Sequence, residues 1–292
     1  MKKETFFSII IPTFKRVKKI SKAIDSILAQ TYKNWELVIV DNYSNDGTTE
    51  LVQSYNSKKI FFYTIKNKGL ISKSRNYGIE RSNGEYLAFL DSDDWWSNNK
   101  LELASNYANK GRELIYHDHY IYSPCNLLKL RGFRARSIQS PAYEDLIFNG
   151  PAFATSSVIV KKSFLVKIKN FNTSRNLIGW EDWDAWLRLS KKTNNFFHIK
   201  KKLSYITIDN ENLSTEQIKI KNSNAFKIKY LKNSIHMPNW YVYTLLVCYF
   251  KSKFFFEARI ILSKIKFNKL NFKQKINLIF IYLSVKFKLV LS

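Results

Sequence analysis

The chain has 292 residues with 45% hydrophobic content, enough for one large domain, or for one domain with an appendage. Its formal net charge of +25 implies an anionic partner, such as a nucleic acid, an anionic membrane surface or a polyanionic substrate, although compositional drift toward Lys also contributes. The two cysteines, Cys125 and Cys248, match no metal-binding or redox spacing and favour a reducing compartment.

No signal-peptide pattern is present at the start of the chain. The longest apolar stretches, 240–250 and 276–285, are shorter than the roughly 20 residues that a membrane-spanning helix needs. We therefore expect a cytoplasmic protein.

The N-terminal third alternates between strand and helix patterns. Strands are expected over 6–11, 35–40, 60–65 and 86–90, and helices over 20–28, 51–55 and 71–79. Ser21 is a candidate cap of the first helix. This order predicts a parallel, doubly wound sheet, which binds ligands at the carboxyl ends of its strands. Four residues that each follow a predicted strand should therefore converge on one crevice. They are Pro12, Asp41, Asn67 and Asp91.

The remainder of the chain is less regular. Strands are expected over 113–122, 154–160 and 203–208, a basic loop over 131–140, and a helix over 180–189 that opens with two acids. From about Thr215 acids almost vanish, and cations interleave with Phe and Ile, which predicts two or more basic amphipathic helices.

Three carboxylates crowd into four residues directly after the strand expected over 86–90: Asp91, Asp93 and Asp94. Such like charges raise one another's pKa, and a divalent cation relieves the repulsion. Mg²⁺ or Mn²⁺ is commonly held by one or two carboxylates while its other positions take substrate phosphates. The cluster therefore predicts a metal–diphosphate site. The alternative is a solvated acidic turn that caps the next helix.

Five segments, in this order, resemble the family 2 glycosyltransferases. They are SIIIPTF at 8–14, WELVIVDNYSNDGT at 35–48, KSRNYG at 73–78, NGEYLAFLDSDD at 83–94 and WEDWDAWLRL at 180–189. The resemblance implies an α/β GT-A fold with a Rossmann-like, mostly parallel central sheet flanked by helices. It implies a GT-A domain over 1–214, with a nucleotide-binding half to about 97 and an acceptor half from about 98. A basic helical extension follows over 215–292. It also implies an inverting transferase that uses a UDP-sugar donor and a divalent metal, Mn²⁺ or Mg²⁺.

By this resemblance, Asp41 accepts the uracil ring N–H, and Arg75 holds a base edge or a phosphate with its fork. The alternatives are a turn cap for Asp41 and a surface ion pair for Arg75. The other donor-site candidates are Pro12, Thr13, Phe14, Asn67, Asp91, Ser92 and Glu181.

The catalytic and metal-binding residues are also implied by the resemblance. Asp93 coordinates the metal, Asp91 reaches the ribose or the metal, and Asp94 is a further acid or a helix cap. Asp182 is the general base that takes the proton of the acceptor hydroxyl, with Asp184 as its rival. A single in-line displacement would then give a β-linkage from an α-linked donor.

Further residues allow two interpretations. Trp180 and Trp183 either stack on sugars or, like Trp186, belong to the core. His117, Asp118 and His119 form either a metal cluster or a polar strand end near the acceptor. Many relatives carry an Arg-x-His before a Ser-rich loop, and 205–214 lacks it. Candidate substitutes are Asp209 and Asn212.

We expect the tail to lie on an anionic membrane surface, which places the enzyme on the inner face of the cytoplasmic membrane. It would move a hexose or N-acetylhexosamine to a lipid-linked oligosaccharide or lipooligosaccharide in bacterial surface-polysaccharide synthesis. Alternatives are a helical subdomain or dimerisation element for the tail, and a nucleic-acid-binding protein or a degenerate transferase for the chain. No nucleic-acid-binding motif is present, so no nucleic acid is expected as partner. The oligomeric state is left open, a homodimer included.

Overall fold

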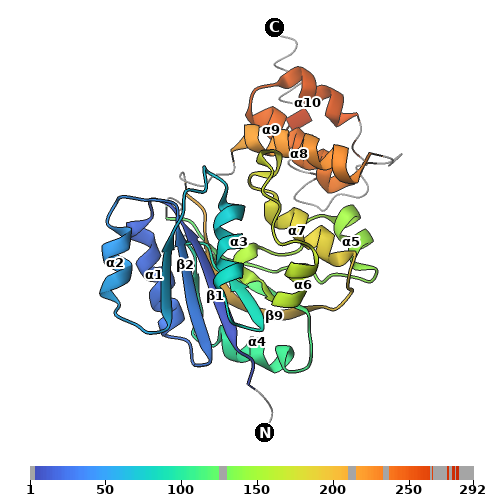
Figure 1. The fold of residues 1–292 in the computed structure, drawn as a ribbon. Coiled ribbons are helices and arrows are strands. Elements are labelled where there is room, and N and C mark those ends of the chain that lie inside the picture. Colours follow the sequence, from blue (N-terminus) through green and yellow to red (C-terminus); the bar gives the residue numbers. More distant parts are fainter. Residues whose placement is uncertain are drawn as a thin grey trace. The chain divides into compact units, whose positions relative to one another are not determined.

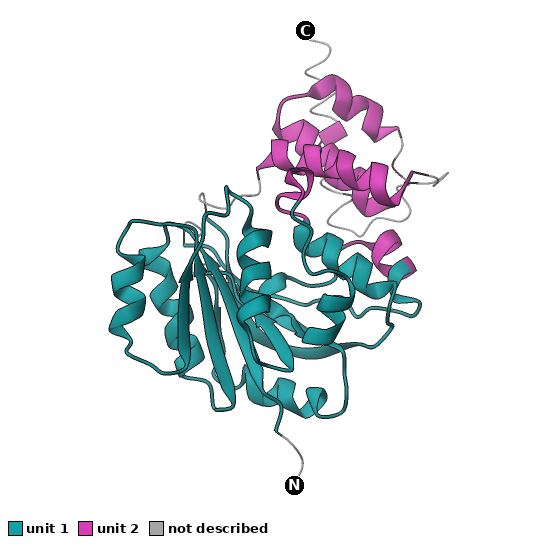
Figure 2. Ribbon diagram, in the orientation of Figure 1, with its two compact units in different colours: residues 1–143, 151–173, 181–211 teal, residues 144–150, 174–180, 212–292 magenta. Residues whose placement is uncertain are grey.

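A computed structural model describes residues 4–124, 130–209, 215–232, 237–263, 265, 275, 278–279 and 281–282. The chain divides into two compact units, shown in Figure 2. Unit 1 comprises residues 1–143, 151–173 and 181–211, and unit 2 comprises 144–150, 174–180 and 212–292. All candidate catalytic, metal-binding and donor-binding residues belong to unit 1.

Within the described residues, nine strands form the sheet of unit 1 (Figure 1). They are β1 (Phe7–Thr13), β2 (Trp35–Asp41), β3 (Ile60–Thr64), β4 (Tyr86–Phe89), β5 (Trp95–Trp96), β6 (Leu114–Tyr122), β7 (Leu130–Phe133), β8 (Ile159–Lys161) and β9 (Phe196–Thr207). The order is β3-β2-β1-β4-β8-β6-β9-β5, and β7 pairs with β6. The first four strands are parallel, whereas β8 joins β4 to β6 in antiparallel orientation. The expected α/β fold is confirmed, with a mixed second half of the sheet.

Helices cover both faces of this sheet. They are α1 (Val17–Leu28), α2 (Thr48–Ser54), α3 (Ile71–Arg81), α4 (Lys100–Ala108), α6 (Lys162–Lys167) and α7 (Glu181–Ser190). Helices α1, α2 and α4 share one buried core with alternate residues of β1 and β2, such as Ile9 and Ile39. On the other face, Gly78 lets α3 approach β1, because a Cβ at this position would lie 2.7 Å from Ile10 Cγ2.

The sequence predicted that the first strand ends before Pro12. In the structure β1 continues to Thr13. The carbonyl of Ile10 accepts from the N–H of Leu90 on the β4 side, and Pro12 faces the same side two residues later. Pairing with β4 has already ended at Ile10, so the missing N–H of Pro12 costs no ladder hydrogen bond.

Three local predictions were wrong. The segment expected as a strand over 154–160 begins with a 3₁₀ turn, η1 (Thr155–Ser157), and only then enters β8. The loop expected over 131–140 contains most of β7, which pairs with β6. Ser21 lies inside α1, whose first amide, that of Val17, donates to Asp46 Oδ2 instead.

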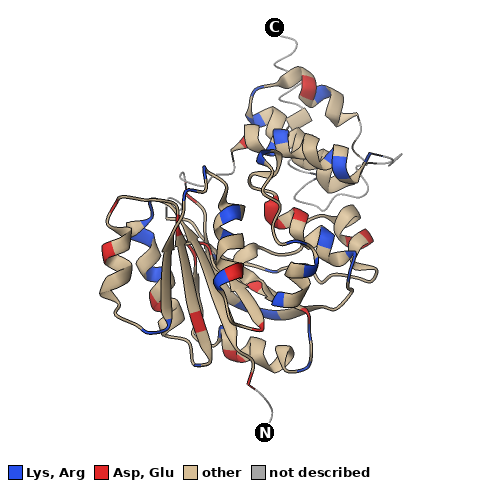
Figure 3. Cartoon of the chain, in the orientation of Figure 1, with Lys and Arg blue, Asp and Glu red and all other residues tan. Residues whose placement is uncertain are grey.

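Unit 2 is helical, as predicted for the tail. It contains most of α5 (Ala142–Asn149), the 3₁₀ turn η2 (Arg175–Leu177), α8 (Glu216–Tyr230), α9 (Asn239–Lys251) and α10 (Phe255–Leu262). Figure 3 shows that blue cationic segments outnumber red acidic ones on α8, α9 and α10. Residues of α9 and α10 pack with Leu278 and Ile281 in a core of their own. No helix in the described part of unit 2, or of unit 1, has the length and apolarity to cross a membrane.

Candidate active site

The carboxyl end of β1 presents a hydroxyl and a ring. Thr13 is buried, and its Oγ1 has no hydrogen-bond partner among the described residues. Phe14, next in the chain, is 48% exposed. A buried hydroxyl without a partner is costly unless a ligand satisfies it. The end of β1 therefore has the chemistry of a binding surface.

Asp41 and Asn67 are both engaged in local turns. The Asp41 carboxylate, buried at the end of β2, accepts the backbone N–H of Ser44 at 2.8 Å and also its hydroxyl. Asn67 donates to Ser74 Oγ at 2.9 Å and accepts from the N–H of Gly69 at 2.8 Å. Asp41 therefore caps the following turn, which was the alternative to uracil binding. Asn67 orders the connection from β3 to α3.

Arg75 joins the two acidic motifs. Its Nη2 donates to Asp91 Oδ1 at 2.8 Å, and its Nη1 donates to Glu181 Oε1 at 2.7 Å. The Arg75 side chain is 4% exposed, so the ion pair is buried rather than superficial. Segments 106 residues apart in the sequence are thereby held at one guanidinium.

The charges around this guanidinium dominate its ionisation. Burial lowers the pKa of Arg75, but the charges of Asp91, Glu181 and Asp182 outweigh burial and raise it above its ordinary value. Arg75 is therefore a fixed positive charge that partly neutralises the acids around it.

Asp94 connects the 3₁₀ turn η1 to the end of β9. Its Oδ2 accepts from Ser156 Oγ at 2.6 Å in η1, and its Oδ1 accepts from the N–H of Thr207 at 2.8 Å at the end of β9. Burial, followed by the charges of Asp91 and Asp93, raises its pKa well above the ordinary range. The buried Lys100 donates to the carbonyl of the same Ser156 at 2.8 Å. Asp94 is thus an anchor, and not the cap of α4.

Asp93 lies half-buried beside Asp91. Burial and the charge of Asp91 raise the pKa of Asp93, while Arg16 and Lys19 oppose that rise. A divalent cation would relieve both the burial cost and the repulsion, and carboxylate oxygens are the donors that Mg²⁺ and Mn²⁺ take. No group of three or more metal-ligating side chains occurs among the described residues. Asp91 and Asp93 are therefore the carboxylates that would hold such a cation.

Arg16 and Lys19, two cations that influence Asp93, belong to none of the motifs predicted from the sequence. Lys19 Nζ pairs with Asp209 Oδ2 at 2.6 Å, which links α1 to the segment after β9. The basic run 15–19, directly behind a strand end, is the signal that could have found them. Asn212, the other candidate substitute for the absent Arg-x-His, lies outside the described residues.

The two candidate bases differ in access. Asp182 is half-buried, and its Oδ2 accepts from Thr155 Oγ1 at 2.5 Å. Asp184 is 1% exposed and pairs with Arg188 Nε at 2.7 Å, so its carboxylate is committed to the interior. Glu181 is buried against Arg75, and Ser92 is buried within the acidic turn.

The tryptophans of 180–189 mainly serve packing. Trp186 is buried and contacts Phe89 and Phe171, which confirms its place in the core. Trp183 is also buried. Trp180 packs on Phe226 and Trp240 within unit 2.

His117 and His119 hold no metal cluster with Asp118. A register shift between β6 and β9 at these residues disturbs the strand alternation on which that interpretation depended. His117 Nδ1 lies 2.7 Å from the carbonyl of Asp118, and His119 stacks on Phe133. Burial lowers the pKa of His119 to about 4, and burial likewise lowers that of His117.

A pH dependence of stability follows from His119. The unfolded chain binds this proton near pH 6.5 and the folded chain only near pH 4, so stability is full above about pH 6.5 and decreases as pH falls. We expect His119→Phe, which keeps the ring, to remove roughly 2 kcal/mol of the difference in unfolding free energy between about pH 7 and pH 5. Urea unfolding at both pH values measures it. An unchanged difference would show that His119 is not held neutral.

Residues 8–164 match the model of a protein family described as "Glycosyl transferase family 2". This segment runs from β1 into the start of α6 and includes Asp91 and Asp93. It ends before α7, so Glu181 and Asp182 lie outside the match.

Among curated relatives, an uncharacterized glycosyltransferase of Rickettsia bellii is 30% identical over 209 residues, 70% of this chain and 29% of that protein. The chain spans about a third of the length of the first curated relatives that it matches. The Escherichia coli UDP-Glc:alpha-D-GlcNAc-diphosphoundecaprenol beta-1,3-glucosyltransferase WfgD is 35% identical over 113 residues, 39% of this chain and 45% of that one. The putative teichuronic acid biosynthesis glycosyltransferase TuaG of Bacillus subtilis is 25% identical over 73% of this chain and 82% of its own.

The fold is shared with Staphylococcus aureus TarS. The structure of its residues 1–349 with UDP-GlcNAc has a TM-score of 0.59 and 17% identity, and covers 94% of this chain and 79% of that one. The structure of the same TarS segment with UDP has a TM-score of 0.57 and 18% identity. The expectation of a GT-A fold is confirmed.

Proposed function

The chain belongs to glycosyl transferase family 2, and on that premise we propose that it is an inverting, metal-dependent glycosyltransferase. It moves a hexose or N-acetylhexosamine from a UDP-sugar to a hydroxyl of a lipid-linked glycan in bacterial surface-polysaccharide synthesis. The observation that carries the proposal is the buried Arg75, bonded to both Asp91 and Glu181. Arg75 thereby holds Asp91, one of the two carboxylates that suit a donor metal, beside α7, the helix that carries the proposed base.

Asp182 is the residue proposed to start the reaction. Its carboxylate takes the proton of the acceptor hydroxyl as the oxygen forms a bond to the anomeric carbon. The bond from that carbon to the UDP oxygen breaks on the opposite side, so the configuration inverts. Thr155 and the N–H of Trp183 both donate to Asp182 and hold it in place. The buried ion pair of Asp184 makes Asp184 the weaker candidate.

Donor binding is proposed at the carboxyl ends of β1, β2 and β4. Thr13 offers a buried hydroxyl, and Phe14 an exposed ring, to the nucleoside. Asp93 and Asp91 would hold Mn²⁺ or Mg²⁺, which supplies charge neutralisation for the diphosphate when bound. Arg16 and Lys19 bring positive charge to the same place. Arg75 acts here as a positioning residue for Asp91 and Glu181.

The substrates are proposed from the relatives. WfgD carries a UDP-sugar donor and a diphosphoundecaprenol acceptor in its name, and TuaG is named for teichuronic acid biosynthesis. TarS was crystallised with UDP and with UDP-GlcNAc. The test is calorimetric titration with a panel of nucleotide sugars, with and without Mn²⁺. Metal-dependent binding of a UDP-sugar supports the proposal, and failure of every nucleotide to bind contradicts it.

For unit 2 we propose contact with an anionic membrane surface. Phe256 and Ile260 are four residues apart on α10 and are 65% and 44% exposed, so they share one apolar face. Lys251, Lys253 and Arg259 lie next to them in the sequence. Apolar side chains that enter the acyl boundary beside cations that meet headgroups would bind such a surface.

We expect Phe256→Ser with Ile260→Ser to lower the vesicle partition coefficient about tenfold or more, since two apolar side chains no longer enter the lipid. Flotation with phosphatidylglycerol vesicles measures the coefficient. Ile228→Ser on α8, where the side chain is 70% exposed, is the matched control and should float like the wild type. Equal flotation of all three proteins would refute membrane contact through α10.

A further inference from the structure

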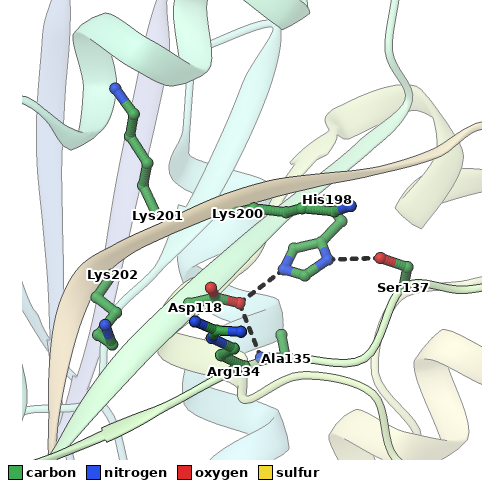
Figure 4. Close-up of a pocket in the computed structure, with 8 residues that line it drawn as sticks. All are labelled: Asp118, Arg134, Ala135, Ser137, His198, Lys200, Lys201 and Lys202. Carbon is green, nitrogen blue, oxygen red and sulfur yellow. Dashed lines mark hydrogen bonds and ion pairs between the residues drawn. The ribbon is translucent and has the colours of Figure 1, made fainter.

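A pocket on unit 1 lies away from the proposed donor site. This pocket of about 490 Å³ opens between β9 and the segment that follows β7 (Figure 4). Its lining residues are Asp118, Arg134, Ala135, Ser137, His198, Lys200, Lys201 and Lys202. Thr207 of β9 bonds to Asp93 and Asp94 in the acidic cluster. Lys202, which lines the pocket, lies five residues before Thr207 on the same strand. At roughly 3.3 Å per residue, the pocket is displaced from the acidic cluster by about 16 Å along the strand.

The floor of the pocket is an ordered hydrogen-bonded chain. His198 Nε2 lies 2.7 Å from Asp118 Oδ1, and His198 Nδ1 lies 2.9 Å from Ser137 Oγ. The N–H of Ala135 donates to the same Asp118 oxygen at 2.8 Å. The Asp118 and His198 side chains are both more than nine-tenths buried, and Tyr116 stacks on the imidazole at 4.9 Å. These contacts offset part of the carboxylate charge and keep the floor rigid.

The walls of the pocket are cationic. Arg134, Lys200, Lys201 and Lys202 line it, against the single carboxylate of Asp118. In Figure 4 the Lys201 side chain points away from Asp118, so the cations that face the pocket are those of Arg134, Lys200 and Lys202. The Lys202 side chain passes close to Gly132 of β7, where an added Cβ would lie 2.5 Å from Lys202 Cε. The absence of a side chain at Gly132 therefore makes room for this lysine beside the pocket.

We propose that this pocket binds a phosphate or diphosphate group of the acceptor, an inference that rests on the proposed function. The excess of cations favours an anionic ligand, and an arginine fork together with ammonium groups matches phosphate oxygens. The donor diphosphate is assigned to Asp91 and Asp93, so a separate anion site suits the other substrate. The acceptor would then be held at its charged end while its hydroxyl meets Asp182.

The test uses inorganic pyrophosphate as probe, titrated calorimetrically into the full chain with UDP present. Arg134→Gln with Lys200→Gln removes two exposed wall cations and should weaken pyrophosphate binding about tenfold or more. The control, Lys58→Gln with Lys192→Gln, removes two exposed lysines elsewhere in unit 1 and should change binding less than about twofold. Gly132→Ala keeps every charge and displaces Lys202, and it should weaken binding at least about threefold.

Equal weakening in the wall and control variants would mean a general charge effect and overturn the proposal, as would unchanged binding in either pocket variant.

A UDP titration in the absence of pyrophosphate tests the proposed function separately, because all three variants should bind UDP like the wild type. In transfer assays, pyrophosphate should compete with a diphosphate-linked acceptor. Competition with the UDP-sugar alone would mean that pyrophosphate binds at the donor site, and would overturn the assignment to the acceptor.

Discussion

Asp182→Asn should lower kcat for sugar transfer about a thousandfold while leaving UDP-sugar affinity within about twofold of the wild type. Asparagine keeps the size of the side chain and can still accept from Thr155, but it cannot take the proton of the acceptor hydroxyl. General-base catalysis of this kind contributes about 10²- to 10⁴-fold. Steady-state kinetics combined with donor calorimetry separate the chemical step from binding.

Asp184→Asn is the matched control for the base, two residues further along the same helix. Asp184 is buried and bonded to Arg188, so its substitution should lower stability and leave kcat of the folded enzyme within about threefold. If Asp184→Asn abolished turnover and Asp182→Asn did not, the assignment of the base would be reversed.

Arg75→Gln should destabilise the protein by about 3 kcal/mol and remove donor binding. The substitution leaves Glu181 buried without its cationic partner, and breaking a buried ion pair costs about 3–5 kcal/mol. The lower figure applies because the Asp91 side chain is 35% exposed and water screens part of its charge. Urea unfolding measures the free energy, and UDP calorimetry with Mn²⁺ measures the site.

Two further variants separate the positioning role of Arg75 from a purely structural one. Arg81→Gln removes an exposed arginine from the same helix and should change stability by less than about 1 kcal/mol. Arg75→Met with Glu181→Met removes a charge pair together and should recover part of the lost stability. Donor binding should stay lost in that double variant. Its full recovery would show that Arg75 does not position Asp91 for the donor.

Much of the fold was predictable because its strands are continuous apolar runs bounded by clear turns. β1, β2 and β4 are buried on both faces, as parallel strands between helices are, and such strands need no alternation to be recognised. The first seven residues of β9 were missed for the opposite reason. His198, Lys200 and Lys202 give that stretch a polar face toward the pocket, and its three consecutive lysines resemble a solvated turn.

Positions along the chain predicted which residues gather at the candidate site, but not how they pair. Asp91 follows β4, and Arg75 lies in α3, which packs on β1 beside β4, so their proximity is consistent with the predicted topology. The bond from Arg75 to Glu181 joins segments on either side of the antiparallel strand β8, and no local pattern encodes that pairing. The same holds for Asp94, whose bonds to Ser156 and Thr207 appear only once the sheet is assembled.

The central claim is that Asp93 and Asp91 hold a metal for a UDP-linked donor, and calorimetric titration with UDP tests it most directly. The measurement compares the wild type with Asp93→Asn, each with and without Mn²⁺. We predict that Mn²⁺ strengthens UDP binding by the wild type about tenfold or more and has little effect on the variant. Equal UDP affinity in all four titrations, or no UDP binding at all, would contradict the claim.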